Sequence, residues 1–433
     1  MIAVLIVLAL GGLMHAARSF SAGLGSAGTE LAFGYLLLSA YFMGKIVSRF
    51  GLPKLTGYIA TGVVAGPFVL GLVSMDMGAS LKIVKGVAIC ILALTAGAEL
   101  NFKKVRPILA TLTSMVFFSV VIGMTVLAGA LLLLRPLLPF FDQLNFVQSL
   151  AVCLTLGIAL SAMSPAVLMA MVSEMKSDGP VTQVMLASVV VADLVVIILY
   201  ALGSSFAVAT VGGGIDVMQT ALAVGWELFG SIAFGLVIGM VIGAYLRSST
   251  KGASLFAVMV CVVVAEIGSR VHLDPLIVML AAGIWLENIS KADAHALIGD
   301  FESAQLPVFL VFFALAGAQL DIYALSAVVV PVLIIAIVRG AVFYTGCRIA
   351  CKRTNADAQV AKYAWYGLLP QAGLTLALAM LVQKTFPTFG VAAALILFGV
   401  GAVNQAVAPV ILRIVMLRTG EAGKRAAHDF AEH

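Results

Sequence analysis

The stretch VMLASVVVADLVVIILYAL, residues 184–202, carries one charged residue, Asp193, at the centre of an otherwise almost wholly apolar run. At about 1.5 Å per residue, this run just spans the hydrocarbon layer of a bilayer. An aspartate at that depth costs about 2.5–3.5 kcal/mol even on lenient insertion scales, and such residues mark ion or proton pathways. The stretch therefore predicts a membrane helix whose carboxylate binds a cation or a proton.

The composition of the whole chain fits this interpretation. Of its 433 residues, 62% are hydrophobic and only 10% are charged, and the mean hydropathy is +1.15. These values predict an all-α polytopic membrane protein and exclude a soluble domain. The net charge of +5 is not a nucleic-acid footprint, because the basic residues lie at segment ends. The five cysteines lack metal-ligand spacing, so we interpret them as small buried residues and predict no cofactor and no enzymatic activity.

Apolar windows of 17–25 residues predict about fourteen transmembrane helices. Their centres lie near residues 9, 40, 64, 90, 122, 160, 193, 232, 260, 280, 311, 336, 373 and 402. With a cytoplasmic N-terminus, eighteen of the 25 basic residues fall on the inner side and six on the outer side, while Arg339 falls inside a helix. This bias predicts a cell (inner) membrane protein with both termini in the cytoplasm. The segment 1–17 is either a true first helix, which we favour, or a signal peptide.

Two of the predicted helices are interrupted. Residues 160–165 read LSAMSP and residues 367–373 read GLLPQAG, so proline and small or polar residues fall within the membrane span, at Pro165 and at Pro370, Gln371 and Gly373. The two helices are seven apart and therefore cross the membrane in opposite directions. This layout predicts an inverted repeat whose broken helices cross at the midplane, as in alternating-access transporters. The alternative is a pair of proline kinks without ligand roles.

The candidate site residues follow from this layout. Monovalent cations prefer oxygen ligands, which Asp193, Ser161, Ser164, Thr155 and carbonyls freed at the break supply. Arg339 is expected to compensate charge by pairing with Asp193 or with unwound carbonyls, or else to reach the membrane surface. Possible accessory residues are Glu99, Asn404 and Gln405. Outside the site, Glu266 and Arg270 are spaced for an i,i+4 ion pair.

Six pieces of the chain, taken in order, resemble the monovalent cation:proton antiporters, which include sodium/hydrogen exchangers and potassium-efflux antiporters. The pieces are residues 57–67 (GYIATGVVAGP), 96–100 (AGAEL), 161–167 (SAMSPAV), the Asp193 helix, Arg339, and residues 369–373 (LPQAG). The resemblance implies a thirteen-helix core with one extra N-terminal helix. It also implies that Asp193 carries the cation and the proton, and that Arg339 is the basic residue facing the breaks.

The same resemblance implies a mobile transport domain and a scaffold domain that forms a homodimer. The expected boundaries are 1–20 for the extra helix, 30–100 and 252–322 for the scaffold, 105–205 and 323–418 for the two transport repeats, 217–247 for a linker helix, and 419–433 for a cytoplasmic tail.

The chain departs from common patterns of the family at three places. Ala192 precedes Asp193 where relatives often have a second polar or acidic residue, Ser164 replaces an aspartate before Pro165, and Gln371-Ala372 replaces charged residues. With one acid at the site, we predict one proton per cation, whereas the choice among Na⁺, K⁺ and Li⁺ stays open. The alternatives are a sodium-coupled symporter of an organic solute, a channel or a non-transporting sensor; an intramembrane aspartyl protease would need a second buried aspartate.

Overall fold

A computed structural model of the chain describes residues 2–20, 28–99, 102, 106–211, 222, 225–248, 252–271, 273–290, 294–319, 328–386 and 388–424. Every regular element within these ranges is helical, and none is a strand. The predicted all-α class is therefore confirmed. The chain divides into two compact units, each built from two separate segments of sequence. Unit 1 comprises Met1–Phe102 with Gly225–Asp321, and unit 2 comprises Lys103–Val224 with Ile322–His433.

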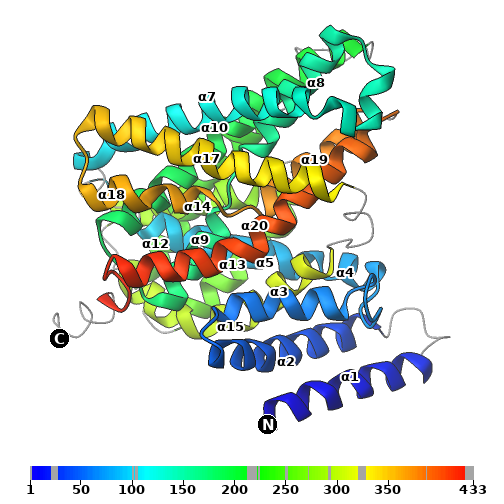
Figure 1. Cartoon of the computed structure of the whole chain (residues 1–433). Helices are drawn as coiled ribbons and strands as arrows, with labels where there is room; N and C mark the ends of the chain where they lie inside the picture. Colours follow the sequence, from blue (N-terminus) through cyan, green and yellow to red (C-terminus); the bar gives the residue numbers. More distant parts are fainter. Residues whose placement is uncertain are drawn as a thin grey trace. The chain divides into compact units, whose positions relative to one another are not determined.

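Unit 1 is a bundle of helices (Figure 1). Small residues let pairs of these helices pack closely. One close approach joins α5 to α14, where a Cβ atom added to Gly283 would lie 2.8 Å from the Cα atom of Gly97. Only glycine allows the two backbones to come this near. The helices are α1 (Ile2–Phe20), α2 (Gly28–Arg49), α3 (Lys54–Ala65), α4 (Met75–Ser80), α5 (Lys82–Glu99), η4 (Trp226–Gly230), α12 (Ser231–Ser248), α13 (Ala253–Val271), α14 (Pro275–Asn288) and α15 (Ala294–Ala318).

Unit 2 contains both interrupted helices. Its elements are η1 (Arg106–Ile108), α7 (Leu109–Leu133), η2 (Arg135–Leu137), η3 (Pro139–Gln143), α8 (Phe146–Leu160), α9 (Pro165–Met175), α10 (Pro180–Val211), α17 (Val329–Thr354), α18 (Ala358–Tyr363), η5 (Ala364–Leu368), α19 (Gly373–Thr385) and α20 (Gly390–Arg418). The long helices α7 and α17 lie side by side, although α7 ends at Leu133 and α17 begins only at Val329 (Figure 1).

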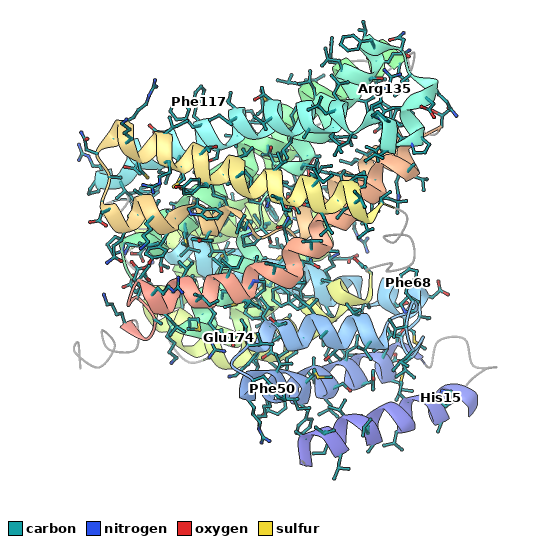
Figure 2. The ribbon with its side chains drawn as sticks, viewed as in Figure 1. His15, Phe50, Phe68, Phe117, Arg135 and Glu174 are labelled. Atoms are coloured by element: carbon teal, nitrogen blue, oxygen red, sulfur yellow. The ribbon has the colours of Figure 1, made fainter. Side chains whose placement is uncertain are left out.

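Seven helical stretches in the described part are long and apolar enough to cross a membrane. They are Thr29–Arg49, Arg106–Leu133, Phe146–Met175, Pro180–Val208, Trp226–Ser248, Val329–Thr354 and Gly390–Arg418. Each of the fourteen predicted centres falls within a helix, but the number of spans stays a prediction. Phe117 on α7 lies on the outside of its unit with 58% of its surface exposed, as expected of a lipid-facing residue (Figure 2).

Two minor predictions are also confirmed. Arg270 donates hydrogen bonds of 2.8 Å from Nε and 2.6 Å from Nη2 to Glu266 Oε1, one turn away on α13. All five cysteines are buried and free.

Candidate functional site

The first break separates α8 from α9. Pro165 begins α9, and since proline disfavours a helical conformation in the residue before it, Ser164 is extended, with φ −131° and ψ 103°. The Ser164 hydroxyl caps α9 by accepting a 3.4 Å hydrogen bond from the backbone N–H of Val167. Proline also supplies no N–H to the preceding turn, so carbonyls at the end of α8 are left for other partners.

The second break separates η5 from α19. Pro370 and Gln371 lie in the irregular stretch 369–372, and Gly373 begins α19. Gln371 is fully buried, and its Nε2 atom donates 3.2 Å hydrogen bonds to the carbonyls of Leu160 and Ala162 in the first break. The two interruptions predicted from sequence therefore exist and touch each other directly.

Arg339 on α17 joins the two breaks. Its guanidinium is fully buried and donates four hydrogen bonds to backbone carbonyls. Nε bonds Leu160 O at 2.8 Å and Nη2 bonds Ala162 O at 2.8 Å in the first break, while Nη1 bonds Leu369 O at 2.8 Å and Nη2 bonds Leu368 O at 3.1 Å in the second. The side chain thus uses at least four of its five N–H groups, and these carbonyl dipoles compensate its buried charge.

Asp193 lies at the first break. Its side chain is 6% exposed, and Oδ1 accepts a 3.3 Å hydrogen bond from the backbone N–H of Met163. This bond brings the carboxylate next to the residue that precedes Ser164. A carboxylate, a hydroxyl and freed backbone oxygens are the ligands that a hard cation prefers.

The other two hydroxyl residues make local bonds. Ser161 Oγ donates 2.9 Å to Gly157 O, one turn back on α8. Thr155 Oγ1 contacts Ala151 O at 3.0 Å and Gly203 O at 2.8 Å. Because Gly203 lies ten residues beyond Asp193 on the continuous helix α10, Thr155 is about 15 Å from the carboxylate along the helix axis. The structure therefore does not bring Thr155 to Asp193.

The accessory candidates fall in different places. Asn404 Nδ2 donates a 2.8 Å hydrogen bond to Gln371 Oε1, which places Asn404 in the network of the breaks. Its neighbour Gln405 is also buried, but its Oε1 atom has no hydrogen-bond partner among the described residues. Glu99 ends α5 in unit 1, and its side chain lies outside the described residues.

One buried acidic residue of unit 2 was not among the site residues predicted from the sequence. Glu421, just beyond α20, is 4% exposed and accepts hydrogen bonds from the first turn of the Asp193 helix. The sequence placed this residue in a tail. A glutamate flanked by Gly420 and Gly423 in a short polar stretch was the only local signal.

Comparison with known proteins finds a matching family model and solved structures of similar fold. The family model described as "Sodium/hydrogen exchanger, transmembrane" matches residues 34–420.

Two solved structures of the sodium proton antiporter MjNhaP1 from Methanocaldococcus jannaschii are similar. One, at pH 8, has 15% identity and a TM-score of 0.65, covering 90% of this chain and 99% of that one. The other, from electron microscopy, has 12% identity and a TM-score of 0.67, covering 89% and 96%. These likenesses establish the fold. No curated protein sequence matches the chain significantly.

Proposed function

This chain belongs to the sodium/hydrogen exchanger family of transmembrane proteins, and from that premise we propose that it exchanges Na⁺, or K⁺, for protons by alternating access. The observation that carries the proposal is the position of Asp193, a buried carboxylate held at the first break by the backbone of Met163. A group in that place can bind either a proton or a cation, and these two occupants exclude each other.

Coupling follows from that exclusion. A carboxylate that is neutralised by a proton or a cation crosses a region of low dielectric much more easily than a bare anion. The carrier therefore changes its accessible side only when occupied, and each cation that moves one way is matched by protons moving the other way. We expect Ser164, Ser161 and freed carbonyls to complete the cation's ligands, whereas the position of Thr155 favours a structural role.

The stoichiometry follows from the charges around the breaks. Arg339 is compensated by four carbonyls, and Gln371 and Asn404 are neutral. These residues fix the geometry of the two breaks without adding a second acid. Asp193 is the one carboxylate that the described residues place at the breaks, and on that basis we predict one proton per cation and electroneutral exchange.

In this proposal unit 2 is the transport domain, since it contains both breaks, Asp193 and Arg339. Unit 1 is the scaffold, through which two copies of the chain form a homodimer. The protein lies in the cell (inner) membrane with both termini in the cytoplasm, as the distribution of basic residues predicts.

The test is cation-driven proton movement in proteoliposomes. Pulses of Na⁺, Li⁺ or K⁺ are given at clamped membrane potential, and internal pH is followed for the wild type and for Asp193→Asn. Asp142→Asn, an exposed carboxylate on η3 of the same unit, is the matched control. We expect proton movement with the wild type and the control, and none with Asp193→Asn. If the wild type moves protons with none of these cations, or if Asp193→Asn retains full exchange, the proposal fails.

A further inference from the structure

The chain turns back sharply where α20 ends. Gly420 adopts a left-handed conformation with φ +68°, and Gly423 follows with φ +78°. Through this turn the N–H of Gly420 bonds Leu417 O at 3.2 Å, and the N–H of Glu421 bonds Met416 O at 3.3 Å. The turn points Glu421 back into unit 2, where only 4% of its surface is exposed.

The Glu421 carboxylate caps the N-terminus of α10. Oε1 accepts a 2.9 Å hydrogen bond from the N–H of Val181, and Oε2 accepts bonds of 2.8 Å from the N–H and 2.7 Å from the hydroxyl of Thr182. The first N–H groups of a helix have no partner within the helix, and its positive end favours an anion. Glu421 therefore satisfies three donors and places its charge at a favourable position.

The backbone around Glu421 extends the contact to neighbouring segments. Asp178 donates its N–H to the carbonyl of Glu421 at 3.1 Å, and Gly423 donates to the carbonyl of Met175, the last residue of α9, at 3.0 Å. Gly179 makes room for this arrangement, because a Cβ atom there would occupy the place of the Glu421 carboxyl group. We call residues 420–423, with their contacts to residues 175–182, the C-terminal clasp.

The C-terminal clasp joins three of the helices around the candidate site. It ties the half-helix α9 to α10 with Asp193 and to α20 with Asn404. Asp193 lies twelve residues beyond Val181, about 18 Å along a continuous helix. A displacement of the first turn of α10 along its axis is therefore carried to the carboxylate.

We propose that Glu421 is a positioning residue for cation exchange, which holds α9, α10 and α20 in fixed register so that Asp193 stays at the first break throughout the transport cycle. This inference rests on the proposed function. It adds a residue near the C-terminal end of the chain that touches neither the cation nor the proton and acts through the placement of α10.

The test compares Na⁺ dependence of exchange for wild type, Glu421→Gln and Glu421→Asp in proteoliposomes. Glutamine keeps the size but loses the charge and presents N–H groups to the donors of α10. A shift of α10 weakens cation binding, so we expect Glu421→Gln to raise KM for Na⁺ about three- to tenfold with little change in kcat. Glu421→Asp, which keeps the charge, is expected to recover part of the affinity. Lys424→Gln, an exposed change in the same turn, is the control.

A second pair of variants guards against loss of folding. Thr182→Val removes the 2.7 Å hydroxyl bond to Glu421 together with the 2.9 Å contact between the hydroxyls of Thr182 and Ser177, whereas Thr182→Ser keeps both. Hydrogen exchange at residues 181 and 182 reports the integrity of the clasp without any transport measurement. The proposal predicts faster amide exchange and raised KM in Thr182→Val and neither in Thr182→Ser.

The possible results distinguish failure of the proposed function from failure of the positioning role of Glu421. If the wild type does not exchange Na⁺ for protons, the proposed function fails, whatever the variants do. If the wild type is active and Glu421→Gln and Thr182→Val open the clasp, as amide exchange shows, while KM stays at its wild-type value, the positioning role is overturned. If amide exchange at residues 181 and 182 is unchanged in both variants, Glu421 does not hold the first turn of α10, and the proposal is overturned.

Discussion

The side-chain amide of Asn404 on α20 donates a 2.8 Å hydrogen bond to Oε1 of Gln371 in the second break. Gln371 in turn donates to the carbonyls of Leu160 and Ala162 in the first break. One neutral side chain therefore links α20 to both interruptions. In a buried site such a network stabilises a single geometry only when each of its members has its partner.

Replacing Asn404 tests this network. Asn404→Leu leaves Oε1 of Gln371 buried without its donor, which costs about 1–3 kcal/mol. We expect a lower thermal unfolding midpoint in detergent and weaker Na⁺ binding. Gln405→Leu is the matched control on the next residue, because it removes an Oε1 atom that has no partner among the described residues. It is expected to be neutral or stabilising, and equal losses in the two variants would argue against the network.

Arg339 provides a second test. Lysine keeps the positive charge but has a single ammonium nitrogen, which cannot reach four carbonyls in two separate breaks. Each buried carbonyl left without a donor costs about 1–3 kcal/mol. We expect Arg339→Lys to lower the unfolding midpoint and to reduce exchange at least about tenfold. Arg348→Lys, at an exposed position on the same helix, should retain both properties. Wild-type exchange by Arg339→Lys would show that charge alone suffices.

Sequence signals located the two breaks and the buried carboxylate because these signals are local. Pro165, Pro370 and the lone charge of Asp193 act on their own segments, so each is visible without knowledge of the fold. The partners of Arg339 could not be assigned in the same way, because its bond to Leu160 spans 179 residues of sequence. Pairing with Asp193 and pairing with carbonyls were equally consistent with its position in the sequence.

Thr155 and Glu421 are two further residues whose partners could not be predicted from the sequence. Thr155 was selected because it is a hydroxyl residue on the broken helix, but its bond to Gly203 fixes it three turns from Asp193. Glu421 was assigned to a tail because its partners, 239 and 240 residues away, contribute backbone N–H groups that leave no mark in side-chain composition. Hydrogen bonds between distant helices depend on tertiary packing rather than on local pattern.

Thr155 therefore gives a third prediction. Thr155→Val removes the 2.8 Å hydrogen bond to Gly203 O while keeping the shape of the side chain. We expect the protein to lose about 1 kcal/mol of stability, seen as a lower unfolding midpoint. Because the hydroxyl lies far from Asp193, KM for Na⁺ should stay unchanged, and Thr155→Ser should behave as the wild type. A raised KM in Thr155→Val would restore Thr155 as a ligand.

Close packing of α7 against α8 gives a fourth prediction. A Cβ atom at Gly157 would lie 2.6 Å from Met124 O and 2.9 Å from Ala128 N, both of which are backbone atoms. Gly157→Ala must therefore push the helices apart just before the first break, and overpacking of this kind costs about 1–3 kcal/mol. Gly129 on α7 has no atom within 4 Å of an added Cβ, so Gly129→Ala should be neutral or stabilising by up to about 1 kcal/mol. Equal thermal unfolding midpoints for Gly157→Ala and Gly129→Ala would contradict this packing.

The last prediction concerns pH and follows from one carboxylate serving two ions. If Na⁺ and H⁺ compete for Asp193, KM for Na⁺ rises as pH falls, because each bound proton removes a cation site. The rise approaches about tenfold per pH unit once most carriers are protonated, and KM levels off at high pH where protons no longer compete. Uptake of radioactive sodium, measured with equal pH on both sides of the proteoliposome membrane, gives KM directly. A KM that is independent of pH, with only the maximal rate changing, would mean that the two ions occupy different groups and that exclusion at Asp193 does not couple them.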